Sequence, residues 1–110
     1  MFNYKKKNSE FFLSKEATFD GEVNTRGIVV LAGKLSGKIN TIDDVLVDNS
    51  AKVDGEIAAN NIVVNGSIEG VLDSVETTKV GEHGKVVGNI ICKAFETAEG
   101  SIFRGKLQIK

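Results

Sequence analysis

The stretch Lys52-Val53-Asp54-Gly55-Glu56-Ile57 places a glycine midway between two apolar residues, with a charged side chain on either side of the glycine. The same apolar–x–Gly–x–apolar unit occurs six times in the chain of 110 residues, centred on Gly21, Gly37, Gly55, Gly70, Gly88 and Gly105. Successive glycines are 16, 18, 15, 18 and 17 residues apart, a mean of roughly 17. A nearly constant period is typical of a solenoid, in which each unit buries its apolar face only by stacking on its neighbours.

A second apolar segment lies between successive units. Its apolar residues recur at every second position, which predicts short β-strands with one buried face. In the two repeats of 18 residues this segment starts six residues after the last apolar residue of the glycine unit, and in the other repeats it starts five residues after it. We attribute the difference to one extra residue in the turn. The expected inward pairs are Ile28/Val30, Val45/Val47, Ile62/Val64, Thr78/Val80 and Phe95/Thr97.

These patterns predict an all-β fold. No segment keeps apolar residues at helical spacing, and Val, Ile and Thr dominate the set. A meander of hairpins would fit the strands locally, but it would not require one period with the same glycine unit. We therefore predict a single-domain parallel β-helix over residues 11–110, with about six coils of roughly 17 residues and a triangular section. The motif glycine is expected either to point inward or to mark a corner.

The composition narrows the classes of partner. The chain carries 14 basic and 15 acidic residues, a net charge of −1, so no nucleic-acid partner is expected. Low net charge also does little to keep copies of the chain apart. Cys92 is the one cysteine, and no apolar run approaches the length of a membrane span. We expect a cytoplasmic protein.

Residues that could carry chemistry are few and scattered. His83 lies in a predicted turn, Gly81-Glu82-His83-Gly84, and is expected to be solvated. Cys92 aligns with Ala59 of an earlier repeat, so a packing role is expected. Asp43, Asp44 and Asp48 lack the spacing of a calcium site. We expect no catalytic, cofactor-binding or metal-binding site, and therefore no enzyme.

Aromatic residues gather toward the two ends of the repeat array. Six phenylalanines and one tyrosine occur in the chain, and none lies between residues 20 and 94. The open end of a β-helix exposes sheet edges that can pair with another chain. The rings could close the end of the core within one subunit, or they could meet another copy. We expect the second, at a polymerisation interface formed by Phe11, Phe12, Leu13, Phe95, Ile102, Phe103, Leu107 and Ile109.

Residues 1–10 precede the repeats and show no strand alternation. Apolar and aromatic side chains followed by three lysines suit a segment that inserts its rings at a lipid surface. The alternative is a disordered tail with ordinary charge. We expect a flexible membrane anchor whose lipid-binding residues are Met1, Phe2, Tyr4, Lys5, Lys6 and Lys7.

Three phrases carry a family resemblance: Lys52-Val-Asp-Gly-Glu-Ile57, Asn61-Ile-Val-Val-Asn-Gly-Ser-Ile-Glu-Gly70 and Gly100-Ser-Ile-Phe-Arg-Gly105. Across about residues 11–107 the chain resembles the bactofilins, bacterial cytoskeletal proteins with a β-helical domain. The resemblance implies right-handed coils that polymerise without nucleotide into non-polar filaments, in which like ends meet. It also implies peripheral attachment to the inner face of the cell membrane, where such filaments position cell-wall enzymes or other morphogenetic proteins. The alternative is a non-polymerising β-helix that serves as a binding module in cell division or morphology.

Overall fold

The computed structural model describes residues 10–110, and every regular element in that range is a β-strand. No helix long and apolar enough to cross a membrane occurs in this range. Short and long strands alternate along the chain. The short strands are β1 (Phe11–Leu13), β3 (Val29–Leu31), β5 (Val45–Val47), β7 (Ile62–Val64), β9 (Thr77–Val80) and β11 (Ala94–Thr97). The long strands are β2 (Thr18–Asn24), β4 (Lys34–Asn40), β6 (Lys52–Ala59), β8 (Ser67–Ser74), β10 (Lys85–Cys92) and β12 (Ile102–Ile109).

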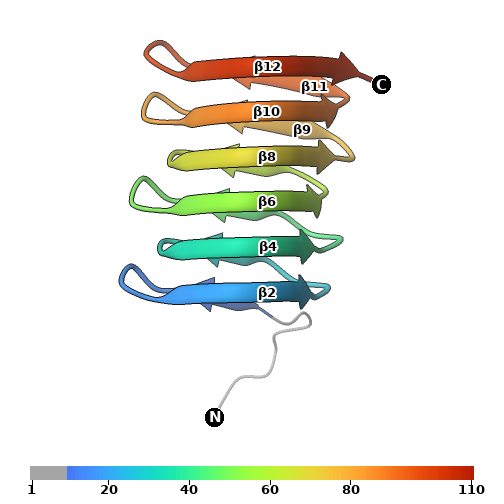
Figure 1. Ribbon diagram of the computed structural model, residues 1–110. Coiled ribbons are helices and arrows are strands. Elements are labelled where there is room, and N and C mark those ends of the chain that lie inside the picture. Colours follow the sequence, from blue (N-terminus) through green and yellow to red (C-terminus); the bar gives the residue numbers. More distant parts are fainter. Residues whose placement is uncertain (1–9) are drawn as a thin grey trace.

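The short strands form one parallel sheet of six strands and the long strands form another. In Figure 1 the long strands are stacked in front and the short strands lie behind them, so that one of each makes a coil. The chain rises as it runs rightward along the front and leftward along the back, which is a right-handed winding (Figure 1). The predicted parallel β-helix of about six coils is therefore confirmed.

Each long strand bends at the glycine of its repeat unit. In β6, Val53 and Ile57 are buried on either side of Gly55, whose φ of +139° is one that residues with a side chain rarely adopt. The glycines lie in register through all six coils. A Cβ added to Gly55 would lie 1.8 Å from the carbonyl oxygen of Gly37 in the preceding coil. The repeat thus requires glycine at this corner both for the backbone angle and for the close stacking of coils.

The core consists of columns of side chains at equal positions in successive coils. One column contains Val23, Ile39, Ile57, Leu72 and Ile90, all of them buried. Two buried hydroxyl groups interrupt the apolar columns, and they satisfy each other through a hydrogen bond of 2.9 Å between Ser74 Oγ and Thr78 Oγ1. The core is therefore continuous along the rod, because every column passes from one coil to the next.

The first coil differs from the prediction by one residue. Val29 and Leu31 are fully buried and lie in register with Val45 and Val47, whereas Ile28 is 38% exposed. The predicted inward pair Ile28/Val30 was therefore wrong. Residues 28–31 are all apolar, so alternation alone does not distinguish the two faces. Register with the next coil decides which face is buried.

Coil length is set mainly in the turn from a short strand to the next long strand. We count from the last buried residue of a short strand to the first buried residue of the next long strand. This separation is four positions in two coils, from Leu31 to Leu35 and from Val64 to Ile68. It is six positions from Val47 to Val53 in a coil of 18 residues. We had assigned the extra residue of the 18-residue coils to the turn from a long strand to the next short strand. That turn is not the main cause of the difference in coil length, because it already spans six positions in the 16-residue coil, from Val23 to Val29.

The two short turns require glycine for a steric reason. A Cβ on Gly33 would lie 2.3 Å from the carbonyl oxygen of Ser14 and 2.4 Å from that of Ala17. Gly66 stands in the same relation to Asp48 and Ala51, at 2.3 and 2.7 Å. Each short turn therefore lies directly against the backbone of the longer turn in the coil before it.

Substituting alanine at two corner glycines should separate the backbone angle from the stacking contact. Gly21 has a φ of +151°, and a Cβ there would meet only the Phe19 ring at 3.7 Å, because no described coil precedes it. Gly21→Ala should cost roughly 1–3 kcal/mol of backbone strain. Gly55→Ala should cost clearly more, since its Cβ also collides with a backbone carbonyl. Chemical denaturation followed by circular dichroism measures both, and equal losses would contradict the stacking argument.

Candidate functional site: the two ends of the rod

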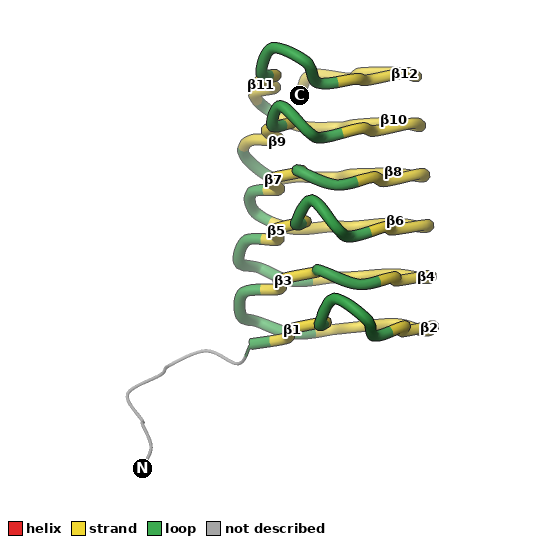
Figure 2. The backbone as a smooth tube through the Cα atoms, turned by 90° about the vertical axis from the view of Figure 1, so that its left-hand side faces the viewer, coloured by secondary structure: helices red, strands yellow, loops and turns green. Residues whose placement is uncertain are grey.

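The strands at the ends of each sheet have a described neighbour on one side only. β2 pairs with β4 and β12 pairs with β10 in the long-strand sheet, while β1 pairs with β3 and β11 with β9 in the other. An edge strand presents N–H and C=O groups that can bond to a further strand. In Figure 2 no further described strand lies over β11 and β12 at the C-terminal end, where only the turn that joins them rises above the coil. This end is therefore an open coil.

The apolar columns continue into the C-terminal coil but lose their cover there. Ile90 is fully buried, whereas Leu107, the next residue of the same column, is 39% exposed. Cys92 is fully buried, and Ile109 above it is 53% exposed. A further coil placed on this surface would bury both side chains, as β12 buries those of β10.

An aromatic pair lies at each end of the core. The ring centroids of Phe95 and Phe103 are 5.4 Å apart at the C-terminal end, and those of Phe11 and Phe19 are 5.5 Å apart at the N-terminal end. Each pair joins the two sheets, and all four rings are partly buried against the core. The rings therefore cover the core of their own subunit and remain only partly exposed.

Most of the residues predicted for the interface continue inward columns at the ends. These are Phe11, Leu13, Phe95, Phe103, Leu107 and Ile109. Two others face outward: Phe12 is in register with Val30 and 65% exposed, and Ile102 is in register with Lys85 and 44% exposed. The structure does not bring these two to the end surfaces.

The sequence analysis missed three residues of the end columns. Phe19 and Val23 continue the columns of Leu35 and Ile39, and Thr97 continues that of Val80. The first repeat unit, which contains Phe19 and Val23, was a signal that could have placed both residues. The residues predicted to bind lipid, Met1 to Lys7, lie outside the described part of the chain.

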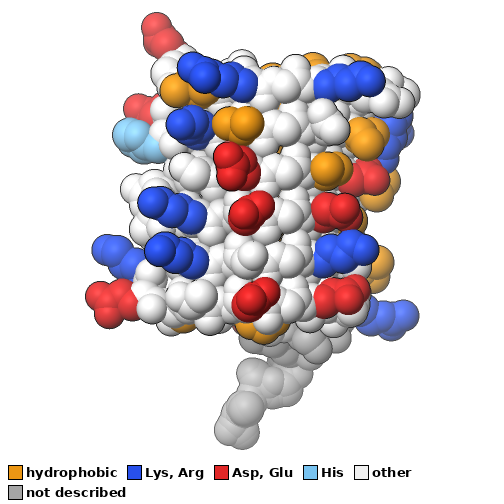
Figure 3. All heavy atoms as spheres, in the orientation of Figure 1, with side chains coloured by type: hydrophobic (Ala, Val, Ile, Leu, Met, Phe, Trp, Pro, Cys, Tyr) orange, Lys and Arg blue, Asp and Glu red, His pale blue; other side chains and the backbone are white. Residues whose placement is uncertain are grey.

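The outer surface of the long strands carries opposite charge at the two ends. Asp20 and Glu22 project from β2, while Arg104 and Lys106 occupy the same register positions in β12. In Figure 3 acidic side chains lie at the level of β2 and basic ones at the level of β12. Charge therefore distinguishes the ends, although apolar columns reach both.

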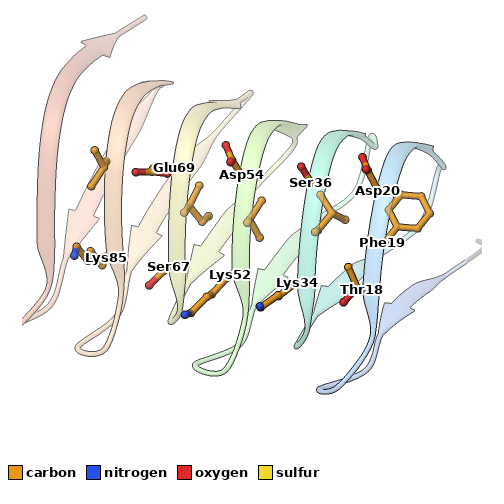
Figure 4. A pocket seen from close by; sticks show the side chains of 14 residues that line it. Thr18, Phe19, Asp20, Lys34, Ser36, Lys52, Asp54, Ser67, Glu69 and Lys85 are labelled. Atoms are coloured by element: carbon orange, nitrogen blue, oxygen red, sulfur yellow. The ribbon is translucent and has the colours of Figure 1, made fainter.

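A groove of about 510 Å³ runs along the first halves of the long strands from β2 to β10. Figure 4 shows lysines along one side of the groove and acidic residues along the other, and its labelled charged residues are Lys34, Lys52, Lys85, Asp20, Asp54 and Glu69. Among residues 10–110 no group of three or more His, Cys, Asp or Glu side chains could hold a metal ion. The groove is thus an open surface with apolar lining residues between two rows of opposite charge.

Comparison with known proteins agrees with this geometry. The family described as Bactofilin, polymer-forming cytoskeletal, matches residues 11–108. The chain is 24% identical over 97 residues to bactofilin BacO of Myxococcus xanthus (strain DK1622), covering 88% of this chain and 77% of BacO. It is also 24% identical over 81 residues to bactofilin BacP of the same organism, covering 74% of this chain but 34% of BacP. No solved structure matches the chain.

The family match begins at the first residue of β1 and ends within β12, so it spans all six coils and both end surfaces. A resemblance first seen in the glycine units thus extends over the whole described rod. The chain belongs to the bactofilin family of polymer-forming cytoskeletal proteins.

Proposed function

We propose that this chain is a bacterial cytoskeletal scaffold that polymerises end to end through its first and last coils without nucleotide. The observation that carries the proposal is the exposure of the core columns at the C-terminal end, where Leu107 and Ile109 are 39% and 53% exposed. A neighbouring subunit would cover these side chains and pair with the free edges of β11 and β12.

The energetics of such a joint are favourable. Full burial of one large apolar side chain contributes about 1.5–3 kcal/mol, and the C-terminal end presents Leu107 and Ile109 together with two strand edges. Association has its own entropic cost, so only part of this free energy appears as affinity. The surfaces are already formed in the single subunit, so stacking itself requires no nucleotide-driven change of shape.

The family resemblance favours joints between like ends, which give a non-polar filament. Such a joint is isologous, because the same surface is used by both subunits. It also places like charges close together: Arg104 and Lys106 of two copies at one joint, and Asp20 and Glu22 at the other. We therefore expect like-end joints to be opposed by electrostatic repulsion that salt can screen.

The salt dependence of polymerisation should reveal which ends meet. Between about 0.1 M and 1 M salt the Debye length falls from roughly 10 Å to 3 Å. For like-end joints the critical concentration should fall over this range, whereas N-to-C joints would make it rise. Pelleting at several protein concentrations measures it. The double variant Arg104→Gln/Lys106→Gln is the control and should flatten the dependence; a critical concentration that rises with salt would contradict like-end stacking.

Replacing Phe103 by arginine should block polymerisation. The substitution removes an apolar contact worth about 1.5–3 kcal/mol and places a charge at the joint, so the critical concentration should rise roughly ten- to a hundred-fold or more. Because no described coil lies above Phe103, the remaining coils should stay folded, as circular dichroism can verify. Electron microscopy and pelleting report the filaments.

Ile102→Arg is the matched control for this variant. It introduces the same charge on the same strand, but on the outward row that contains Lys85. Filaments should form normally from Ile102→Arg and be lost from Phe103→Arg. Normal filaments from Phe103→Arg would instead support the alternative in which the aromatic pair closes the core within one subunit.

We further propose that residues 1–10 attach the filament to the inner face of the cell membrane, where it would position cell-wall or cell-shape proteins. Each of the lysines at positions 5–7 would contribute about 1 kcal/mol near anionic lipid. One copy would bind weakly, whereas a filament displays many copies and binds through avidity. Polymerisation would then control recruitment to the membrane.

Deletion of residues 1–10 should remove binding to anionic vesicles while leaving filaments intact, since β1 begins at Phe11. Phe103→Arg with an intact N-terminal segment should bind the same vesicles only weakly, because avidity is lost. Co-sedimentation with anionic and with uncharged vesicles measures both effects. Undiminished binding after the deletion would end the anchor hypothesis.

A further inference from the structure

The corner at which each long strand turns into the next short strand carries exposed apolar residues. Ile42 is 73% exposed in the turn after β4, and Val75 is 57% exposed in the turn after β8. Turn positions are ordinarily taken by Gly, Asn, Asp or Ser. Two large apolar side chains on one edge of the rod therefore indicate a surface that another group covers.

A hollow of about 380 Å³ extends along this corner, and both apolar side chains line it together with Ala58. The buried residues that flank the turn after β6, Ile57 and Ile62, are five positions apart. Those that flank the turns after β4 and β8 are six positions apart. The shorter turn after β6 therefore leaves a recess between Ile42 and Val75.

Negative charge lies on both sides of this recess. Asp43 and Asp44 belong to the turn after β4, and Glu76 belongs to the turn after β8. The basic residues of the corner, Arg26 and Lys93, occupy the turns after β2 and β10, so the acidic part is confined to the middle of the rod. We refer to its five residues as the acidic corner: Ile42, Asp43, Asp44, Val75 and Glu76.

The edge of the hollow already binds one ammonium group of the chain. Lys110 Nζ lies 3.3 Å from Asp73 Oδ1 and donates a hydrogen bond of 3.0 Å to the carbonyl oxygen of Ser74. The side chain thus reaches from the end of β12 past β10 to the end of β8, and it lines the hollow. Among residues 10–110 no ion pair involves a carboxylate of the acidic corner. The acidic corner can therefore take further basic groups.

The chain before β1 starts at the foot of the same corner. The backbone N–H of Phe11 donates a hydrogen bond of 3.0 Å to the carbonyl oxygen of Ile28, so β1 begins directly beneath the turn after β2. All turns from long to short strands lie on one side of the rod, on the right in Figure 1. Residues 1–9, which lie outside the described part of the chain, are therefore tethered to the edge that carries the hollow.

The length and the residue order of this segment suit the acidic corner. At about 4.8 Å per coil the recess lies roughly 10 Å above the start of β1, whereas nine extended residues span up to about 30 Å. Upward along the corner, Asp43 and Asp44 come first and the recess second. Backward along the chain, the lysines at positions 5–7 come first and the rings of Tyr4 and Phe2 second.

The carboxylates select against other occupants. Anionic lipid would be repelled by them, and so would a second copy of the same corner. A basic segment of another protein has the same chemistry as residues 1–9, but it lacks their tether. The tether gives residues 1–9 a high effective concentration at the corner.

We propose that residues 1–9 dock on the acidic corner of their own subunit, with the three lysines beside its carboxylates and an aromatic ring in the recess. Ordering nine residues costs conformational entropy, so the docking is readily reversed. It requires neither a polymer nor a membrane.

The docking has a consequence for membrane attachment, and this part rests on the proposed anchor function of the segment. The side chains that would enter the acidic corner are the ones proposed to bind lipid, so a docked segment cannot bind a membrane. The apparent affinity for lipid is then reduced to the fraction of subunits whose segment is undocked. The acidic corner thus competes with the membrane for the same residues.

The fluorescence of Tyr4 tests the docking, because it is the one tyrosine of a chain without tryptophan. The full chain carrying Phe103→Arg keeps the subunits apart. Acrylamide should quench Tyr4 at least about two-fold more strongly in 1 M salt than at low salt, because salt screens the ion pairs. Glu76→Lys should give the strong quenching already at low salt. Its matched control is Glu82→Lys, an exposed residue in the turn at the opposite corner, which should leave the quenching unchanged.

Three results would overturn the docking. The first is quenching at low salt as strong as that of the urea-unfolded chain, which would leave the acidic corner to a basic segment of another protein. The second is an equal effect of Glu76→Lys and Glu82→Lys. The third is protection of Tyr4 that disappears on hundred-fold dilution, since a contact within one subunit does not depend on concentration.

Vesicle binding separates the docking from the proposed anchor. Glu76→Lys should bind anionic vesicles at least about three-fold more tightly than Glu82→Lys, although the two variants have the same net charge. Deletion of residues 1–10 from both should abolish the difference. Equal binding by the two full-length variants, or a difference that survives the deletion, would overturn the competition between corner and lipid. Protection of Tyr4 without vesicle binding by either variant would support the docking and overturn the anchor instead.

Discussion

Stacking of hydrogen-bonded coils is the interaction on which the rest of the structure depends. A single coil of about 17 residues cannot enclose its own apolar side chains, so each is buried by the coils before and after it. Interior positions such as Ile57 and Leu72 reach almost complete burial in this way, whereas the last residues of the same columns do not. The incompleteness of the end coils is thus a direct result of how the interior is stabilised.

The end surfaces and the outer faces have different origins. The ends are apolar because the core columns reach them, and they would be apolar in any rod cut between two coils. The apolar side chains on the outer face of the short-strand sheet have no such origin, since Leu46 and Val63 could be polar without disturbing the core. The exposure of Leu107 therefore follows from the fold alone, whereas that of Leu46 does not.

Sequence reasoning found the architecture because the repeat is a global pattern. Six glycines at a nearly constant spacing predict the coil number and the corner of each coil, and the structure gives a steric reason for glycine at that corner. Local alternation was weaker evidence: it failed at Ile28 to Leu31, where every residue is apolar and only pairing with Val45 and Val47 decides the face. For the same reason Phe12 and Ile102 were assigned to the ends on hydrophobicity, while register places them on outer faces.

Because of the glycine column, the length of the rod can change only by whole coils. At each corner there is no room for a side chain between the residue and the coil before it. A strand that slipped by one residue would therefore press a side chain against the backbone carbonyl group of that coil. Residues can be gained or lost in the turns, as coils of 15 to 18 residues demonstrate, without shifting that phase. A duplication or loss of one complete repeat would therefore change the subunit in steps of about 4.8 Å and leave both terminal surfaces as they were.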